Sequence, residues 1–421
     1  MPIKLSFTNQ YQTVRRQTLD LCQNLQVEDF VIQSMDDVSP SKWHLAHTTW
    51  FFENFLLSEF CQGYTWFHPQ FKFLFNSYYE TVGNFHARPH RGLLSRPTTE
   101  EVFAYRKEID RRMIDFLEKG SYDREEVESI VTVGLQHEQQ HQELILTDIK
   151  YNFFCNPLKP ALNERDLTDK EVAPLQQWMS IEEGVYEVGF EGEGFSYDNE
   201  SPRHKIYLQD FELAMRLVTN REYLAFIEDR GYERAELWLS DGWKDLKRSR
   251  CKAPLYWEQK DGVWMQFSLS GMVPLNLEEP VCHVSFYEAA AFARWAGHRL
   301  PTEFEWEVAA KQKGTIKGNF VESGRFHPQV ARGNQLFGDC WEWTQSSYSP
   351  YPGYQAPFSP LGEYNGKFMC NQQVLRGGSC MTPRDHIRPS YRNFFYPHSS
   401  WQCTGIRLVN AVPVLNDTPI F

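Results

Sequence analysis

The first 155 residues carry a helical pattern of hydrophobic and polar positions. Glycine is rare there, and apolar residues recur at intervals of three and four, the repeat that turns one face of an α-helix towards a core. Ser39-Pro40 predicts an N-cap followed by proline at the first helical position. The pattern predicts four helices: one near Tyr11–Asn24, one from Lys42 to about Phe60, one from Thr98-Thr99 to near Gly120, and one from Asp123 to about Tyr151. Four such helices predict a four-helix bundle over residues 1–155.

The helical pattern stops after residue 155. Prolines and charged residues dominate 156–177, and this composition predicts a linker. Beyond it, Gly184–Gly189 alternates as a strand does, and Ser285–Trp295 predicts one clear helix, while glycine, proline and tryptophan become frequent. We therefore expect an α+β protein of two domains, with a loop-rich second domain of short strands over residues 178–421.

Two histidines stand four residues apart in the last predicted helix of the bundle. His137 and His141 share one face of that helix. They continue a stripe with spacings of three and four that is otherwise mostly apolar: Val127, Ile130, Gly134, His137, His141 and Leu144. The next position on the stripe is the polar Asp148, so we expect the buried stripe to end near Leu144. Burying two imidazoles without partners costs roughly 1–3 kcal/mol each, and a metal ion would satisfy both.

A third ligand is expected from the second predicted helix. His47 lies on a similar stripe, formed by Trp43, His47, Trp50, Asn54 and Leu57, whereas His44 falls off it and is expected to be a surface or helix-packing residue. Three neutral imidazoles with open positions suit Fe(II), Zn or Cu better than Mg or Ca. Glu143 lies roughly 200° around the helix from His141, so we expect it to support the site rather than bind the metal.

Two other interpretations of the histidines have to be weighed. They could be core residues hydrogen-bonded to buried partners. His137-Glu138-x-x-His141 also matches the zinc metalloprotease pattern, in which the glutamate is the general base. The extended form of that pattern needs a glycine and a third histidine, where this chain has Leu144 and Thr147. The protease interpretation is therefore weak.

Charge and composition exclude several classes of protein. The net charge of −12 disfavours nucleic acid and anionic lipid as partners. The N-terminus lacks a signal-peptide pattern, and no apolar run is long enough for a membrane span. The nine cysteines include no Cys-x-x-Cys pair, which indicates a reduced, cytoplasmic chain and gives no support for a structural zinc site.

Several motifs in one order resemble a known enzyme family. The first half resembles the DinB-like bundle of ergothioneine-biosynthesis sulfoxide synthases, and the second half resembles their formylglycine-generating-enzyme-like domain. In the first half the matching segments are Lys42–Glu53, Leu74–Glu80 and His137–Glu143. In the second half they are Asp198–His204, Val218–Tyr223, Arg299–Glu307, Trp341–Thr344, Leu375–Ser379 and Gly405–Leu408.

The resemblance implies a mononuclear non-haem Fe(II) enzyme that uses O2 as co-substrate. Such enzymes join the sulfur of cysteine, or of γ-glutamylcysteine, to C2 of the imidazole of hercynine (Nα-trimethylhistidine) and form a sulfoxide. Carried over to this chain, the iron ligands are His47, His137 and His141, the three residues that the stripes also select.

The resemblance also implies roles for residues outside the ligand set. Tyr78 and Tyr79 would donate a proton or an electron, with packing near a helix end as the alternative. Arg88 and Arg91 would bind the carboxylate of the thiol substrate, unless they are surface charges of a loop. Gln140 and Asn393 would bind hercynine, and Phe394 and Phe395 would either line its pocket, where ring faces suit a quaternary ammonium, or belong to the core. The branch that uses γ-glutamylcysteine carries an aspartate near the Phe394-Phe395 pair, so this pair favours free cysteine.

The chain departs from the family pattern at two places. Formylglycine-generating enzymes carry catalytic cysteines near the positions of Thr382 and Ile387, so sulfatase activation is not expected. Cys380 stands where an aromatic residue is usual. The usual Gly-Asn-Val-Trp-Glu-Trp run reads Gly338-Asp339-Cys340-Trp341-Glu342-Trp343 here, which is expected to alter local packing or a calcium site.

Three alternatives remain open at this stage: a related synthase for selenoneine, one for ovothiol, and a non-catalytic binding module. The cysteine-using branch suggests a homo-oligomer, although nothing in this sequence requires one.

Overall fold

The computed structural model describes residues 7–120, 122–356 and 365–410. Contacts within the chain divide it into two compact units. One unit runs to Glu164 and includes the turn Leu269–Gly271, and the other begins at Arg165. Within the described ranges, no helix combines the length and apolar character needed to cross a membrane.

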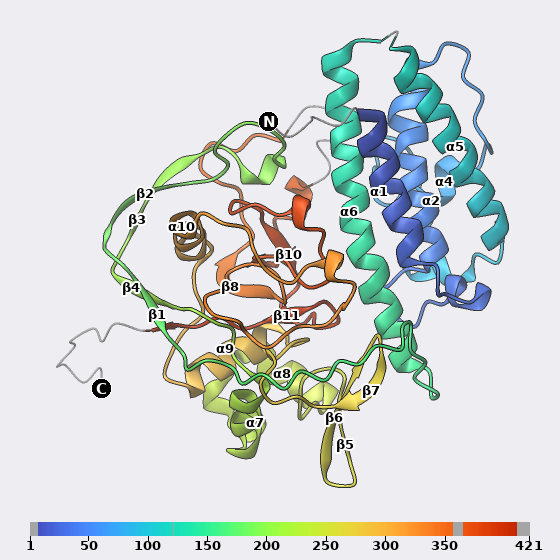
Figure 1. Cartoon of the computed structure of the whole chain (residues 1–421). Helices are drawn as coiled ribbons and strands as arrows, with labels where there is room; N and C mark the ends of the chain where they lie inside the picture. The colour runs from blue at the N-terminus through green and yellow to red at the C-terminus, as the bar shows by residue number, and fades with distance from the viewer. Residues whose placement is uncertain (1–6, 121, 357–364, 411–421) are drawn as a thin grey trace. The chain divides into compact units, whose positions relative to one another are not determined.

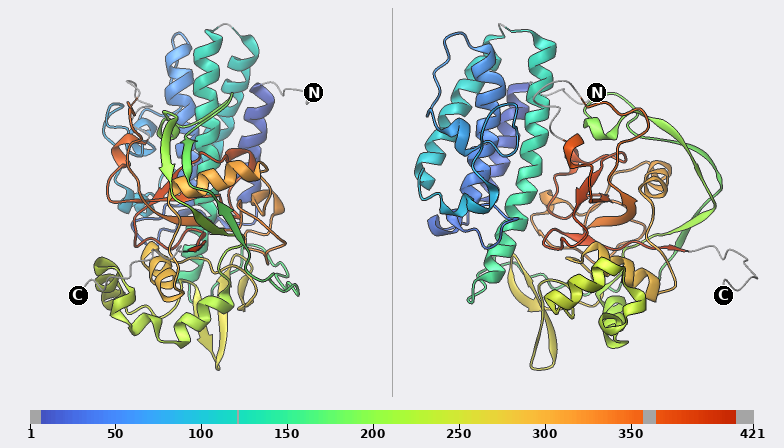
Figure 2. Two further views of the ribbon diagram at one scale, coloured as in Figure 1. Left: turned by 90° about the vertical axis from the view of Figure 1, so that its left-hand side faces the viewer. Right: turned by 180° about the vertical axis from the view of Figure 1, so that it is seen from behind.

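The first unit is built around four long helices. They are α1 (Phe7–Leu21), α2 (Ser41–Phe52), α5 (Thr99–Lys119) and α6 (Arg124–Cys155). Figures 1 and 2 show the four helices side by side, and α6 packs against both α1 and α2. Shorter helical segments connect them: η1 (Val27–Val31), η2 (Glu53–Leu57, a π-turn), α3 (Ser58–Phe60), α4 (Phe71–Leu74) and η3 (Arg88–Leu93). The predicted four-helix bundle is confirmed.

Local capping explains most of the helix ends. The Thr98 hydroxyl accepts a hydrogen bond from the backbone N–H of Glu101, whose carboxylate accepts one from the N–H of Thr98, so α5 begins with a capping box. It ends at Gly120, whose φ of 62° suits glycine. Asp123 caps α6. The predicted cap at Ser39 is wrong: α2 begins at Ser41 without a side-chain cap, and Ser39 Oγ instead accepts a hydrogen bond from Arg91 Nη1 at 2.9 Å.

A buried carboxylate ties the bundle helices together. Glu138 on α6 accepts hydrogen bonds from Arg15 Nη1 on α1 at 2.9 Å and from Arg106 on α5. Thr18 Oγ1 on α1 donates a third, at 2.6 Å. Arg15 also donates to Thr49 on α2 at 2.9 Å. A buried charge is tolerated only when it is paired in this way, so one acidic residue on α6 fixes α1 and α5 directly and α2 through Arg15.

The second unit combines short strands with loops and a few helices, as the sequence predicts. The strands are β1 (Trp178–Ile181), β2 (Gly184–Val188), β3 (His204–Leu208), β4 (Phe211–Ala214), β5 (Trp257–Lys260), β6 (Val263–Ser268), β7 (Gly271–Pro274), β8 (Trp341–Ser347), β9 (Gln373–Arg376), β10 (Asn393–Phe395), β11 (Thr404–Gly405) and β12 (Val409–Asn410). The α-helices of this unit are α7 (Asn220–Glu228), α8 (Ser240–Ser249), α9 (Phe286–Trp295) and α10 (Glu303–Lys313). Short 3₁₀ turns complete the unit: η4 (Asp198–Glu200), η5 (Gly231–Glu233), η6 (Ala235–Leu237), η7 (Val321–Ser323), η9 (Gly366–Phe368) and η10 (Arg384–His386).

The central sheet of the second unit has the strand order β10-β9-β8-β11. Smaller sheets are β1-β4-β12, β2-β3 and β5-β6-β7. β8 and β11 run parallel, with Thr404 opposite Trp341, and β8, β10 and β11 are labelled in Figure 1. Trp341 and Trp343 on β8 and Trp306 on α10 are fully buried, so these large aromatic residues serve as core.

Candidate metal centre

Three buried histidines converge between α2 and α6. The candidate ligand atoms of His47, His137 and His141 all lie within 4.8 Å of one another. Gly134, one turn before His137, permits this close approach, because a Cβ there would stand 2.6 Å from the ring of Phe52. The structure therefore brings together the three histidine side chains that the stripes in the sequence select.

The imidazole of His47 is held from several sides. Its Nδ1–H donates to the carbonyl oxygen of Phe75 at 2.6 Å, which leaves the lone pair on Nε2. The ring lies between Trp43, at 4.6 Å between centroids and 12° between planes, and Trp50, at 5.5 Å and 16°. Such a bond to the second nitrogen fixes the tautomer and orientation of a metal ligand.

A fourth histidine orients His141. His44 Nε2 lies 3.0 Å from Asp148 Oδ2, and His44 Nδ1 lies 2.8 Å from His141 Nδ1. Because a carboxylate only accepts, His44 donates from Nε2 and accepts at Nδ1. His141 then donates from Nδ1 and keeps a lone pair on Nε2. The chain Asp148–His44–His141 is therefore an extended form of the carboxylate–histidine–metal arrangement.

Two expectations about this region are wrong, one of them in part. Of the two alternatives for His44, a surface residue and a helix-packing residue, the first is wrong, since His44 is buried and lies between His141 and Asp148 of α6. The buried stripe of α6 also does not end near Leu144, because Asp148 is buried one turn later. Asp148 is tolerated there because its carboxylate accepts hydrogen bonds from His44 and from the backbone N–H of Ser39, at 2.8 Å. The seven-residue spacing from His141 to Asp148, which places both on one face of α6, was the signal in the sequence that Asp148 continues the buried stripe.

The three histidines suit a divalent transition metal. Burial lowers the pKa of all three imidazoles, that of His137 to about 3, so the neutral, metal-binding form prevails. His47 Nε2 and His137 Nε2 are 3.1 Å apart. Two nitrogens bound at right angles to one metal, at about 2.1 Å each, lie about 3 Å apart. The donor set and its spacing thus fit a bound metal ion.

The carboxylate next to His137 is not available as a general base. Glu138 points to Arg15 and Arg106, as described above, and those two guanidinium groups hold its pKa at about 2 although burial raises it. A metalloprotease needs that glutamate beside the metal-bound water. The geometry therefore contradicts the protease interpretation. Glu143 is half-buried on α6.

The paired tyrosines lie one ring away from the triad. Tyr79 is fully buried, 5.7 Å from Trp50 between ring centroids, and Trp50 in turn stacks on His47. Tyr78 is half-buried and stacks on Tyr79 at 4.6 Å. Asn76 fixes this turn through hydrogen bonds to the backbone of Tyr79. Of the two, Tyr79 is the one linked to a ligand through a single intervening ring.

The two arginines occupy different environments. Arg91 is buried, its guanidinium carbon lies 3.3 Å from the centroid of Trp43, and its Nη1 donates to Ser39. Burial and then Arg88 lower its pKa, and none of the described residues pairs it with a carboxylate. Arg88 is exposed and donates to the carbonyl of Asp37. The structure thus brings Arg91, stacked on Trp43, towards the triad, but not Arg88.

The remaining predicted substrate residues are spread over both units. Gln140 is half-buried on α6, between the two histidine ligands. Asn393, Phe394 and Phe395 form β10 of the second unit. Phe394 stacks on Tyr348 at 4.0 Å and 10°, and Asn393 Oδ1 accepts from the backbone N–H of Phe394.

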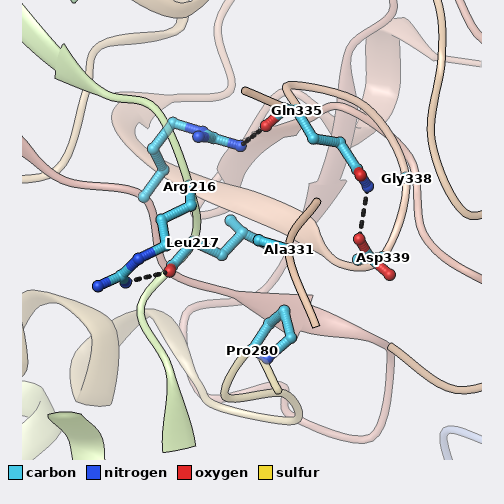
Figure 3. A pocket seen from close by; sticks show the side chains of 8 residues that line it. Arg216, Leu217, Pro280, Ala331, Gln335, Gly338 and Asp339 are labelled. Carbon is cyan, nitrogen blue, oxygen red and sulfur yellow. Dashed lines mark hydrogen bonds between the residues drawn. The ribbon is translucent and has the colours of Figure 1, made fainter. Parts of the chain in front are cut away.

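A small pocket of the second unit contains Asp339, at the place where the sequence raises the question of a calcium site. Figure 3 shows Asp339 next to Gly338 and joined by a hydrogen bond to the side chain of Gln335, in a pocket that Leu217 also lines. Its carboxylate accepts hydrogen bonds from Asn319, Gln335 and the backbone N–H of Gln329. These donors occupy the oxygens that a cation would need, and the described residues around Asp339 form no cluster of metal ligands.

Comparison with known proteins agrees with this architecture. Residues 10–145 match the DinB superfamily, and residues 163–335 and 333–412 match the sulfatase-modifying factor enzyme 1-like domain. A hercynine oxygenase of Mycolicibacterium thermoresistibile is 32% identical over 304 residues, which cover 65% of this chain and 67% of the relative. One of Mycobacterium tuberculosis is 30% identical over 312 residues, covering 66% and 71%.

Two further proteins match smaller parts of the chain. A formylglycine-generating enzyme of Streptomyces coelicolor is 29% identical over 272 residues, 52% of this chain and 84% of that enzyme. The solved structure of PvdO from Pseudomonas aeruginosa aligns with 55% of this chain and 93% of its own, at 15% identity and a TM-score of 0.36.

Fold, triad and matches together define an enzyme that combines a DinB-like bundle with a sulfatase-modifying-factor-like domain. The chain belongs to the hercynine oxygenase family. It is accordingly a sulfoxide synthase of the oxidoreductase class, which confirms the family resemblance, the two-domain α+β fold and the enzyme assignment.

Proposed function

We propose that this enzyme binds Fe(II) at His47, His137 and His141 and couples cysteine to hercynine. In the balanced reaction the imidazole C2–H and the thiol S–H each lose hydrogen, and a C–S bond forms. O2 accepts four electrons, and one oxygen atom goes to the sulfoxide and the other to water. Bound Fe(II) would supply O2 activation and hold the sulfur as thiolate. The protein would act in the cytoplasm.

The observation that carries the proposal is a buried cation beside the three neutral ligands. Arg91 lies under Trp43, which itself stacks on His47, and a buried guanidinium without an anion is costly. The carboxylate of an amino-acid substrate would relieve that cost with two parallel hydrogen bonds. Arg91 would therefore orient the thiol substrate by its carboxylate.

Other residues would complete the site. The O–H of Tyr79 or Tyr78 would donate a proton during the reaction. Gln140 and Asn393 would bind hercynine, with Phe394 and Phe395 offering ring faces to the trimethylammonium group. Arg88, which is exposed and donates to the carbonyl of Asp37, would act on the thiol substrate through its positive charge rather than by direct contact. Phe394 also supports cysteine over γ-glutamylcysteine, because this ring stacks on Tyr348 and offers no charged or hydrogen-bonding group to a γ-glutamyl moiety.

The test is a coupling assay with two competing thiols. The protein is loaded with Fe(II) without oxygen, given hercynine with equal cysteine and γ-glutamylcysteine, exposed to O2 and analysed by mass spectrometry. We expect mainly the cysteine sulfoxide. His141→Ala should abolish both iron retention and coupling, whereas His68→Ala, which changes an exposed bundle histidine, should preserve both. Formation of neither coupled product, a product formed mainly from γ-glutamylcysteine, or turnover by His141→Ala would contradict the proposal.

A further inference from the structure

A second cluster of metal-ligating side chains lies inside the second unit. Cys282, His283 and Cys403 are all buried, and their ligand atoms lie within 4.8 Å of one another. Cys403 Sγ is 3.9 Å from His283 Nε2. This group shares no residue with the histidine triad of the bundle. It also excludes Thr382 and Ile387, which stand near the positions of the catalytic cysteines in formylglycine-generating enzymes.

Backbone pairing assembles the cluster from distant parts of the chain. Cys282 and His283 precede α9, and Cys403 immediately precedes β11. Thr404 Oγ1 donates to the carbonyl oxygen of Val284 at 2.7 Å, and the N–H of Val284 donates to the carbonyl oxygen of Thr404 at 3.4 Å. These bonds fix the two segments side by side. The donors are therefore placed by the fold, although their separation in the chain conceals them in the sequence.

More sulfur surrounds the centre of the cluster. The Sδ of Met381 lies 3.7 Å from Cys403 Sγ, and Cys380 Sγ lies 4.0 Å from it. Both side chains are fully buried. Thiol, thioether and imidazole groups are soft or borderline donors, and together they select Cu(I) and similar ions over Mg or Ca.

The backbone at His283 is held in a costly conformation. His283 has a φ of 65°, and Tyr256, whose ring meets the His283 imidazole edge-on at 4.6 Å, has a φ of 75°. Non-glycine residues are strained in this left-handed region of the backbone and persist there mainly where the surrounding structure fixes the geometry. Here the conformation holds the imidazole of His283 against the thiol of Cys403.

The number of donors favours a three-coordinate ion. Structural zinc is almost always bound by four ligands, whereas among the described residues only the ligand atoms of Cys282, His283 and Cys403 meet here within 4.8 Å of one another. With bonds of about 2.3 Å to sulfur and 2.0 Å to nitrogen at 120°, the two donor atoms lie about 3.7 Å apart, close to the 3.9 Å between Cys403 and His283. We propose that Cys282, His283 and Cys403 form a buried site for a soft monovalent metal ion, Cu(I), with the thioether of Met381 adjacent.

The test is a Cu(I) competition titration of the reduced, full-length protein without oxygen, with bicinchoninate as the competing coloured chelator. We expect the protein to withhold one equivalent of Cu(I). X-ray absorption of that complex should show sulfur and imidazole nitrogen at the ion. Substituting a direct ligand, in Cys403→Ser and separately in Cys282→Ser, should lower the affinity by more than about 100-fold, since even indirect partners of metal ligands contribute about 10–100-fold.

Two matched variants separate this site from the rest of the molecule. Cys22→Ser changes a buried cysteine of the bundle, and His141→Ala removes a proposed ligand of the triad. Both variants should still withhold one equivalent of Cu(I) from the chelator. Circular dichroism checks that the serine variants are folded. If they are not, the X-ray absorption spectrum of the wild-type Cu(I) complex decides which atoms bind the ion. Failure to compete with the chelator, nitrogen-only coordination, preferential retention of Zn(II), or loss of binding in His141→Ala would each overturn the proposal.

Discussion

At the scale of single residues, the orientation of His141 depends on a partner that does not touch the metal site directly. Asp148 accepts from His44, and His44 accepts from His141. We predict that Asp148→Asn lowers the affinity for Fe(II) by about 10–100-fold, because such supporting partners fix the tautomer and the ring orientation of the ligand. Anaerobic competition titration with a chelator measures this effect. Asp115→Asn, at an exposed position of α5, is the control, and an unchanged affinity in Asp148→Asn would refute the role of Asp148.

The same residues show how far sequence reasoning reaches at this scale. Spacing selects His137 and His141, because residues i and i+4 share one face of a helix. It selects His47 in the same way, from the stripe of the second predicted helix. It does not identify His44 or Asp148, since their burial is stabilised by hydrogen bonds between different helices. A polar residue on a mostly apolar stripe looks the same in the sequence in two cases. Either the buried stripe ends at that residue, or the residue is itself buried and forms hydrogen bonds with a partner on another helix.

At the scale of elements, Glu138 is the point where α6 is fixed to α1 and α5. Burial raises its pKa, but the guanidinium groups of Arg106 and Arg15 outweigh this and hold the pKa at about 2. A pKa below the unfolded value near 4.5 stabilises the fold at neutral pH, here by roughly 3 kcal/mol. That contribution is complete above pH 4.5 and is lost as the pH falls towards 2.

We therefore predict that Glu138→Gln removes both stability and part of its acid dependence. At pH 7 the free energy of unfolding should fall by about 3–5 kcal/mol, because two buried guanidinium groups lose their partner. Between pH 4.5 and 2.5 the variant should lose less further stability than the wild type. Urea unfolding across this range measures both effects. Glu128→Gln, whose pair with Arg124 is largely solvent-exposed, should match the wild type, and parallel pH profiles for Glu138→Gln and wild type would contradict the assignment.

The elements also show why the two halves of the chain differ in predictability. The bundle helices carry their own boundaries, such as the Thr98 capping box and Gly120, so periodicity and caps place them within a few residues. Strands such as β11, of two residues, exist only because β8 lies beside them. No local pattern marks such a strand, and for the same reason the group around Cys403 could not be predicted.

At the scale of the whole molecule, all three proposed iron ligands lie in one of two compact units. An ion that binds only the native bundle stabilises it by about 2.7 kcal/mol at a hundredfold excess over its dissociation constant. For a unit of this size we predict a rise of about 5–10 °C in its unfolding temperature on anaerobic addition of Fe(II). Differential scanning calorimetry should show one transition moving while the other stays. His141→Ala should abolish the shift, and an equal shift of the whole profile in that variant would show that Fe(II) binds elsewhere.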